Sequence, residues 1–296
     1  MRRRDVLKAA AGALGLAAWP LGWATAAEDE KRRVLYFTRS VGFEHSPVAR
    51  RGERLSHSEQ VLTEMGRRAG FAVECTKDGR VFDGDLDRYD AFALYTCGDL
   101  TQPSKDGAPP MSVKGKERLL EAIASGKGLI GFHSAADTFH STGPDQGAQA
   151  KLDPYIAMLG GEFVAHGAEQ EALLIIASRF PGAGEIGCSE GISFTDEWYA
   201  LRNFAKDLHV ILVQETQYLK GACYQRPNYP ATWARLHGKG RVFYTSLGHR
   251  DEIWTNPFFQ AIVMGGFAWA LGRAKAEVSP NLDKVAPQAN QLSRSA

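Results

Sequence analysis

The chain has 296 residues, of which 44% are apolar and 23% are charged, and its formal net charge is +1. This composition is that of a globular protein with a sizeable core, and it excludes a disordered chain, a collagen-like chain and a multi-span membrane protein. Residues 1–26 contribute +3, so the remainder carries −2. Because positive and negative charges nearly cancel, the chain has no positive electrostatic field to attract a phosphate backbone, and we expect no nucleic-acid partner.

The first 26 residues have the pattern of a twin-arginine signal peptide. Arg3-Arg4 is followed by one free position, two apolar residues and Lys8, and then by an uncharged stretch that ends in Ala24-Thr25-Ala26. That tripeptide is the small-x-small pattern that signal peptidase accepts. We expect export to the periplasm with cleavage near Ala27, so that the protein meets the membrane only through this segment. The alternative is an uncleaved membrane anchor, since the stretch is nearly long enough to span a bilayer.

Segments typical of strands and helices alternate along the rest of the chain. Helices are predicted at 56–69, 113–125 and 257–271, and apolar runs predict strands at 34–37, 71–75, 90–95, 128–132, 173–177, 210–213 and 241–246. A strand followed by a helix, repeated, predicts an α/β domain at 33–273 with a mostly parallel central sheet and helices on both faces. Loops are expected at 101–111 and 139–149, and residues 274–296 form a polar C-terminal tail that we expect to be disordered.

The four cysteines match no zinc ribbon and no CxxC motif. We expect Cys75, Cys97, Cys188 and Cys223 to be buried small apolar residues, as free cysteines often are. One or two disulfides are the alternative in an oxidising compartment.

Polar residues follow the ends of three predicted strands, and each of these segments contains a histidine. His45 follows the strand at 34–37, His133 follows the strand at 128–132, and His249 follows the strand at 241–246. In an open α/β sheet, ligands bind outside the carboxyl ends of the strands. Because the chain has only eight histidines, we predict that these three share one site.

The residues around His133 have the shape of a nucleophile elbow. An apolar strand leads into Gly131-Phe132-His133-Ser134-Ala135, with small residues at the flanking positions. The nucleophile position holds histidine, which disfavours a serine hydrolase and a cysteine nucleophile. Asp137 lies four residues further on and would share a helix face with His133. We therefore predict that Asp137 orients His133 or joins it as a ligand, and that the two form a catalytic acid–base pair.

A second polar segment, Asp196-Glu197-Trp198-Tyr199, places acids beside aromatic rings. In an extended chain alternate side chains share a face, so that either Glu197 and Tyr199 or Asp196 and Trp198 point together. An acid beside an aromatic ring suits a sugar, whose hydroxyls meet the carboxylate. The alternative is a strand end with a core tryptophan. Trp233 is expected in the core of a hairpin that turns at residues 238–240.

Several of these motifs, in order, resemble the trehalose-utilisation (ThuA-like) family. They are Gly-Phe-His-Ser-Ala-Ala-Asp-Thr-Phe (131–139), His166 after Gly160-Gly161-Glu162-Phe163, Asp196-Glu197-Trp198-Tyr199, Trp233 before residues 238–244, and Gly248-His249. The resemblance covers about 33–273. It implies a flavodoxin-like, class I glutamine amidotransferase-like fold and a role in carbohydrate catabolism. Glutaminases of that superfamily have cysteine at the elbow, where this chain has His133, so we expect no release of ammonia from glutamine.

The resemblance adds His166 to the predicted site. His45, His133, His166 and His249, with Glu197, offer ligands suited to Zn²⁺, Mn²⁺, Fe²⁺ or Ni²⁺. The alternative is that the histidines act as general acid and base without a metal. No organic cofactor is indicated.

We interpret the chain as an exported enzyme that acts on a sugar or glycoside, which includes an oxidised keto-sugar. Isomerisation, elimination and hydrolysis remain alternatives because each needs an acid or a base. His45, Glu197, Tyr199 and His249 are the expected substrate-binding residues. The other interpretation is a non-catalytic carbohydrate-binding protein with the same cleft.

Overall fold

A computed structural model describes residues 32–141, 151–183 and 191–293. The predicted signal peptide at 1–26, Cys188 and most of the loop at 139–149 lie outside these residues. Within the described part of the chain, no helix is long and apolar enough to cross a membrane.

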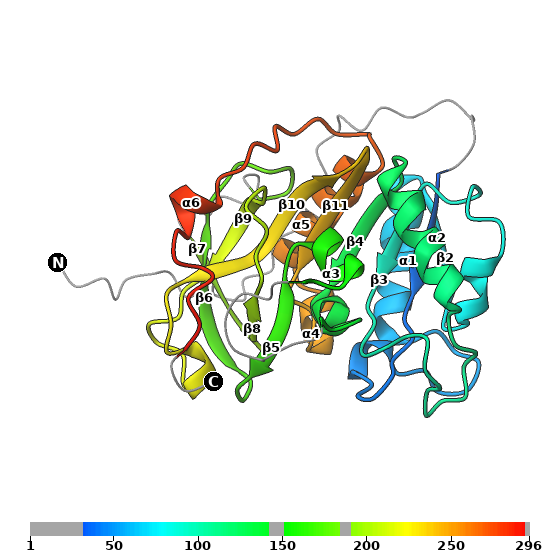
Figure 1. Cartoon of the computed structure of the whole chain (residues 1–296), viewed down its shortest axis with the longest axis horizontal. Coiled ribbons are helices and arrows are strands. Elements are labelled where there is room, and N and C mark those ends of the chain that lie inside the picture. Colours follow the sequence, from blue (N-terminus) through cyan, green and yellow to red (C-terminus); the bar gives the residue numbers. More distant parts are fainter. Residues whose placement is uncertain (1–31, 142–150, 184–190, 294–296) are drawn as a thin grey trace. The chain divides into compact units, whose positions relative to one another are not determined.

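A nine-stranded sheet runs through the domain in the order β2-β1-β3-β4-β11-β10-β9-β6-β7 (Figure 1). Its first five strands are parallel: β2 (Ala72–Thr76), β1 (Arg33–Phe37), β3 (Ala91–Leu94), β4 (Gly128–Phe132) and β11 (Gly240–Thr245). Strands β3 and β4 are buried along their whole length, as expected for strands covered by helices on both faces. This half of the sheet confirms the predicted α/β class.

The other half of the sheet is antiparallel, and of its antiparallel pairing the sequence predicted only the hairpin that turns at residues 238–240. It consists of β10 (Tyr229–His237), β9 (His209–Gln214), β6 (Gln170–Ile176) and β7 (Gly191–Asp196). Parallel neighbours need a crossover, usually a helix, whereas antiparallel neighbours need only a turn. No α-helix lies between β9 and β10, nor between β10 and β11. The turn at residues 238–240 closes the predicted hairpin, and Trp233 is fully buried in its core.

Helices cover both faces of the sheet, as predicted (Figure 1). One face carries α1 (His57–Ala69), α4 (Asp251–Trp254) and α5 (Pro257–Ala270). Helix α4 contacts both α1 and α5. The other face carries α2 (Val113–Ala124) and α3 (Pro154–Leu159), which pack against β11. Helix α1 begins at a capping box of Ser56 and Glu59, and α5 begins at Asn256, whose side chain accepts hydrogen bonds from the first turn.

The described part of the C-terminal segment packs on the domain, so the prediction of a disordered tail was wrong for these residues. It forms the short helix α6 (Leu282–Val285), and Leu282, Ala286 and Ala289 are buried in the core. The Asn281 side chain accepts a hydrogen bond from the Val210 N–H at 2.6 Å and donates one to its carbonyl oxygen at 3.0 Å. An amide that pairs with a strand edge in this way anchors a segment whose polar composition indicates disorder.

A two-stranded sheet stands beside the main one and supports the site described below. It pairs β5 (Glu162–His166) with β8 (Tyr199–Arg202) and sets His166 opposite Tyr199. Cys75, Cys97 and Cys223 are free thiols. Cys97 and Cys223 are buried, as expected, whereas Cys75 is only half-buried.

Candidate functional site

The turn after β4 places His133 in a strained backbone conformation. Its φ is +39°, in the left-handed region that residues with a Cβ rarely adopt. The imidazole is fully buried, and its Nδ1 lies 2.8 Å from the Ser246 carbonyl oxygen. Nδ1 therefore carries the proton and donates a hydrogen bond to that oxygen, which leaves the Nε2 lone pair free. Nε2 lies 3.4 Å from a carboxylate oxygen of Glu197. The strained turn agrees with the elbow predicted from the sequence.

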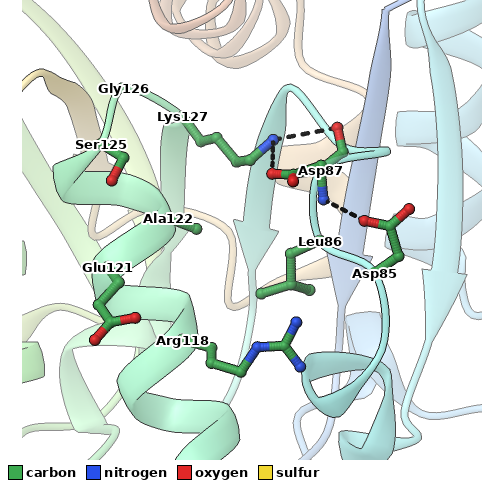
Figure 2. A pocket seen from close by; sticks show the side chains of 9 residues that line it. All are labelled: Asp85, Leu86, Asp87, Arg118, Glu121, Ala122, Ser125, Gly126 and Lys127. Carbon is green, nitrogen blue, oxygen red and sulfur yellow. Dashed lines mark hydrogen bonds and ion pairs between the residues drawn. The ribbon is translucent and has the colours of Figure 1, made fainter.

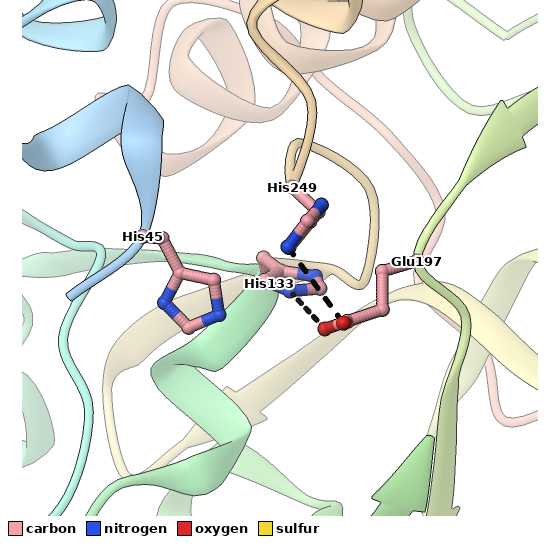
Figure 3. Close-up of side chains that lie close together, drawn as sticks. All are labelled: His45, His133, Glu197 and His249. Carbon is pink, nitrogen blue, oxygen red and sulfur yellow. Dashed lines mark ion pairs between the residues drawn. The ribbon is translucent and has the colours of Figure 1, made fainter. Parts of the chain in front are cut away.

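Four side chains from distant parts of the chain meet at this elbow (Figure 3). His45, His133, Glu197 and His249 each offer one ligand atom, and these atoms all lie within 4.8 Å of one another. The three imidazole rings are 4.9–5.4 Å apart between centroids. The predicted convergence of the strand-end histidines at the carboxyl edge of the sheet is confirmed.

His166 belongs to the same site but lies at its edge. Its Nδ1 is 3.0 Å from Glu197, and 45% of its side chain is exposed. It is not among the four residues whose ligand atoms converge. Of the ligands that the sequence offered, His166 is therefore the one that lies outside the converging set.

Alternation along the segment from 196 to 199 turns Glu197 and Tyr199 toward the histidines. The Tyr199 hydroxyl lies 3.2 Å from His45 Nε2, and its ring centroid is 4.0 Å from that of His133. Trp198 points the other way, into the core, where its Nε1 donates to the Gln170 carbonyl oxygen. The first of the two pairings left open by the sequence is therefore the one observed.

Asp196 positions the loop that carries His249, a role that the sequence analysis missed. Its fully buried carboxylate accepts hydrogen bonds from the backbone N–H groups of Gly248 at 2.9 Å and Arg250 at 3.1 Å. Gly248 has a φ of +112°, which favours glycine. The sequence contained the acid, but nothing in it indicated that its partners are backbone groups 52 and 54 residues further on.

Burial and mutual proximity favour the neutral forms of His45 and His249. Burial, together with the neighbouring histidines, lowers the pKa of His45 to about 2 and lowers that of His249. Burial opposes the ionisation of Glu197, but His133 and His249 outweigh it and hold the pKa of Glu197 below its usual range. At neutral pH His45 and His249 are therefore neutral and Glu197 is ionised, which are the protonation states that metal ligation requires.

The same side chains have hydrogen-bonding capacity that the protein does not fill. His133 Nε2 and His45 Nδ1 are buried without a hydrogen-bond partner. A buried unpaired polar atom costs about 1–3 kcal/mol, so such atoms indicate a site for a further group. Imidazole and carboxylate together suit divalent transition metals. These residues could hold a metal ion.

Asp137 does not orient His133, contrary to the sequence-based prediction. It accepts hydrogen bonds from the Cys97 thiol at 3.0 Å and from His140 Nε2 at 2.5 Å, while Ser246 holds the His133 ring. The prediction assumed an α-helix, but residues 133–137 form a 3₁₀ helix. With three residues per turn, the fourth residue on lies about 120° away from the first.

Asp137 instead forms an ion pair at the edge of the site. His140 lies between Asp137 and Glu162, with Nδ1 at 3.4 Å from the latter. Hydrogen bonds to these two carboxylates raise the pKa of His140 to about 9. A charged histidine therefore stands near the site at neutral pH.

A separate cavity lies elsewhere in the domain (Figure 2). Its volume is about 480 Å³, and it is lined by residues 85–87, by the C-terminal part of α2 and by Lys127. Lys127 directly precedes β4, so this cavity lies at the amino edge of the parallel strands, whereas ligands of such sheets bind at the carboxyl edge. Its cations already bond to the protein, since Lys127 donates to the Tyr89 carbonyl oxygen and Arg118 to that of Gly84. We assign it no ligand.

Comparison with known proteins adds a family and a fold. The family model ThuA, described as trehalose utilisation, matches residues 33–270. A ThuA-like protein from Bacteroides uniformis ATCC 8492 has 16% identity and a TM-score of 0.60, over 87% of this chain and 97% of that chain. A ThuA-like protein from Parabacteroides merdae ATCC 43184 has 18% identity and a TM-score of 0.55, over 89% and 97%.

A third solved structure is a cytoplasmic protein from Salmonella typhimurium LT2. It has 14% identity and a TM-score of 0.50, over 82% of this chain and all of that chain. No curated protein matches the sequence at a significant level. At these identities the structural likeness shows the fold alone, which is the class I glutamine amidotransferase-like fold expected from the sequence.

Proposed function

The chain belongs to the trehalose-utilisation (ThuA-like) family, and on that premise we propose that it is an enzyme of carbohydrate catabolism that acts on a sugar or glycoside. The observation that carries this proposal is the meeting of three imidazoles and one carboxylate within 4.8 Å at the carboxyl edge of the sheet. Neutral imidazoles beside an ionised carboxylate are groups that exchange protons or hold a metal. The sugar class comes from the family, and the acid–base chemistry comes from the site.

The metal-binding part of the proposal is that His45, His133, Glu197 and His249 hold one divalent transition metal ion. The unpaired Nε2 of His133 and the short distances among the four ligand atoms support this assignment. Zn²⁺, Mn²⁺, Fe²⁺ and Ni²⁺ all suit such ligands. When bound, the ion would polarise a carbonyl or hydroxyl oxygen of the sugar.

Proton transfer is assigned to His166 in this proposal. His133 is not assigned this role, because its Nδ1 faces the Ser246 carbonyl oxygen and its Nε2 is a ligand of the proposed ion. His166 is partly exposed and lies 3.0 Å from Glu197, which can hold the proton-bearing form of its ring in place. This arrangement replaces the acid–base pair of His133 and Asp137 predicted from the sequence. Isomerisation, elimination and hydrolysis of a sugar, including one oxidised to a ketone, each use such a group.

We further propose that the protein acts in the periplasm after export. The support is the sequence of residues 1–26 alone, with its paired arginines and small-x-small cleavage pattern.

The proposal is tested by a turnover screen on protein purified without chelator and analysed for metal. The substrates are trehalose and other disaccharides, in their plain and oxidised forms. We expect turnover of at least one of them by the wild type. His166→Ala should lower kcat by about 10²–10⁴-fold, while the matched control His237→Ala, at the hairpin on the opposite edge, keeps wild-type activity. Saccharide binding without turnover would establish the non-catalytic alternative, and neither binding nor turnover would refute a carbohydrate site.

A further inference from the structure

An exposed aromatic side chain lies directly beside the histidine cluster. Phe43 is 63% exposed. Among the large apolar side chains of the described residues, only Tyr218 and Val113 are more exposed. Its ring centroid is 4.8 Å from that of His45, in an edge-to-face arrangement. An exposed phenylalanine needs no explanation by itself, but one that borders a polar site offers a flat apolar surface to whatever enters that site.

Phe43 also lines a cavity of about 260 Å³, so a single ring borders both this cavity and the cluster. The other lining residues are Ser40, Gly42, Glu44, Lys105 and Asp106. The volume lies just below the range of about 300–1,000 Å³ typical of drug-sized ligands, which suits a single sugar ring. One aromatic face, two carboxylates, an ammonium and a hydroxyl together supply the apolar and hydrogen-bonding contacts that a pyranose requires.

Buried charged groups hold the two walls of this cavity. On one side, Lys77 donates to Glu44 Oε1 at 2.5 Å and to the Thr38 carbonyl oxygen at 3.2 Å. On the other side, the fully buried Arg39 donates to the carbonyl oxygens of Leu100, Gln102 and Ala108, which fixes the loop that carries Lys105 and Asp106. The cavity is therefore preformed rather than dependent on loop closure.

One polar group of the cavity has no partner in the protein. Ser40 is only 7% exposed, and its hydroxyl makes no hydrogen bond. Leaving a buried hydroxyl unpaired costs free energy, and a ligand hydroxyl in the cavity would recover it. This observation is independent of Phe43 and also indicates a ligand.

We infer that the cavity between Phe43 and Asp106 is a second sugar subsite, and that the substrate is accordingly a disaccharide or a glycoside with a sugar aglycone. One ring lies at the histidine cluster. The other stacks on Phe43, accepts a hydrogen bond from Lys105 and hydrogen-bonds Ser40, Glu44 or Asp106. This inference rests on the proposed function and adds to it the size of the substrate.

The test compares a disaccharide with a single ring by isothermal titration calorimetry on the full chain. The probes are trehalose and methyl α-D-glucopyranoside, each titrated into wild type, Phe43→Ala and Lys105→Ala. We expect the wild type to bind trehalose more tightly. Each substitution should weaken trehalose binding about tenfold and change methyl glucoside binding less than twofold. Leu236→Ala removes another exposed apolar side chain, 54% exposed and near the opposite edge, and should change neither affinity.

Two results would contradict the inference, and they differ from each other. If trehalose binds but both substitutions leave its affinity unchanged, or weaken both probes equally, the cavity is not a second subsite although the carbohydrate site stands. If the wild type binds neither saccharide, the proposed function fails and the subsite fails with it. Unchanged thermal unfolding of Phe43→Ala and Lys105→Ala separates lost contacts from lost folding.

Discussion

His133→Gly should be more stable than His133→Ala, although glycine is usually the less stable of these two replacements. His133 has a φ of +39°, in the left-handed region. For a residue with a Cβ, this conformation destabilises the folded state by about 1–2 kcal/mol. Alanine keeps that cost, and glycine removes it. Glycine also gains about 0.5–1 kcal/mol of backbone entropy in the unfolded chain, which opposes folding. The glycine variant should therefore be more stable than the alanine variant by about 0.5–1 kcal/mol.

Both variants lose the same contacts, so the comparison isolates the backbone. The hydrogen bond from Nδ1 to Ser246 is worth about 1 kcal/mol, and the packing on Tyr199 is removed in each case. The assay is urea denaturation in the presence of chelator, which keeps any bound ion from contributing to the free energy of unfolding. Both variants should be folded and should lose turnover, because each removes a ligand of the proposed metal ion.

The control is an alanine at an ordinary helical position. Ala122→Gly in α2 should cost about 1 kcal/mol, which is the normal order. If His133→Ala proves more stable than His133→Gly by a similar amount, the elbow is not strained and the argument from backbone geometry is wrong.

Three further predictions concern the ion pair of His140 with Asp137, the chemistry of the elbow and the N-terminus. By NMR, His140 should titrate with a pKa of about 9, and Asp137→Asn should return this pKa toward about 6.5. Because the folded pKa is raised, the stabilisation of the fold by charged His140 is full below pH 6.5 and is lost as the pH rises through about 9. Titration of wild-type His140 near pH 6.5 would refute this prediction. No ammonia should be released from glutamine, since an imidazole at position 133 cannot form the required thioester, and release at an enzymatic rate would overturn that reading of the elbow. Sequencing of periplasmic protein should begin near Ala27, whereas intact Met1 on protein recovered from the cytoplasm would exclude export.

The sequence predicted best what depends on local pattern and on the general geometry of parallel sheets. Continuous apolar runs identified β1, β3 and β4, because strands covered on both faces have no polar side. The convergence of His45, His133 and His249 followed from their positions after strands whose carboxyl ends meet at one edge. Alternation narrowed the acidic segment to two pairings, one of which, Glu197 with Tyr199, is observed.

What the sequence did not predict depends on long-range pairing or on fine helical geometry. The partner of Asp137 was missed because a 3₁₀ turn and an α turn cannot be distinguished by the spacing of two polar residues. The bonds from Asp196 to the His249 loop join segments that no periodicity relates. The polar C-terminal segment is ordered by Asn281 and by a few small buried side chains, which contribute little to composition.

The central claim is that His45, His133, Glu197 and His249 form one divalent metal centre. The most direct test is the metal content of protein purified without chelator, measured by mass spectrometry together with protein concentration. We expect about one transition metal ion per chain in the wild type and in His237→Ala, and less than about a tenth of that in His249→Ala and Glu197→Ala. No ion in the wild type, or an ion that the last two variants retain, would contradict the claim.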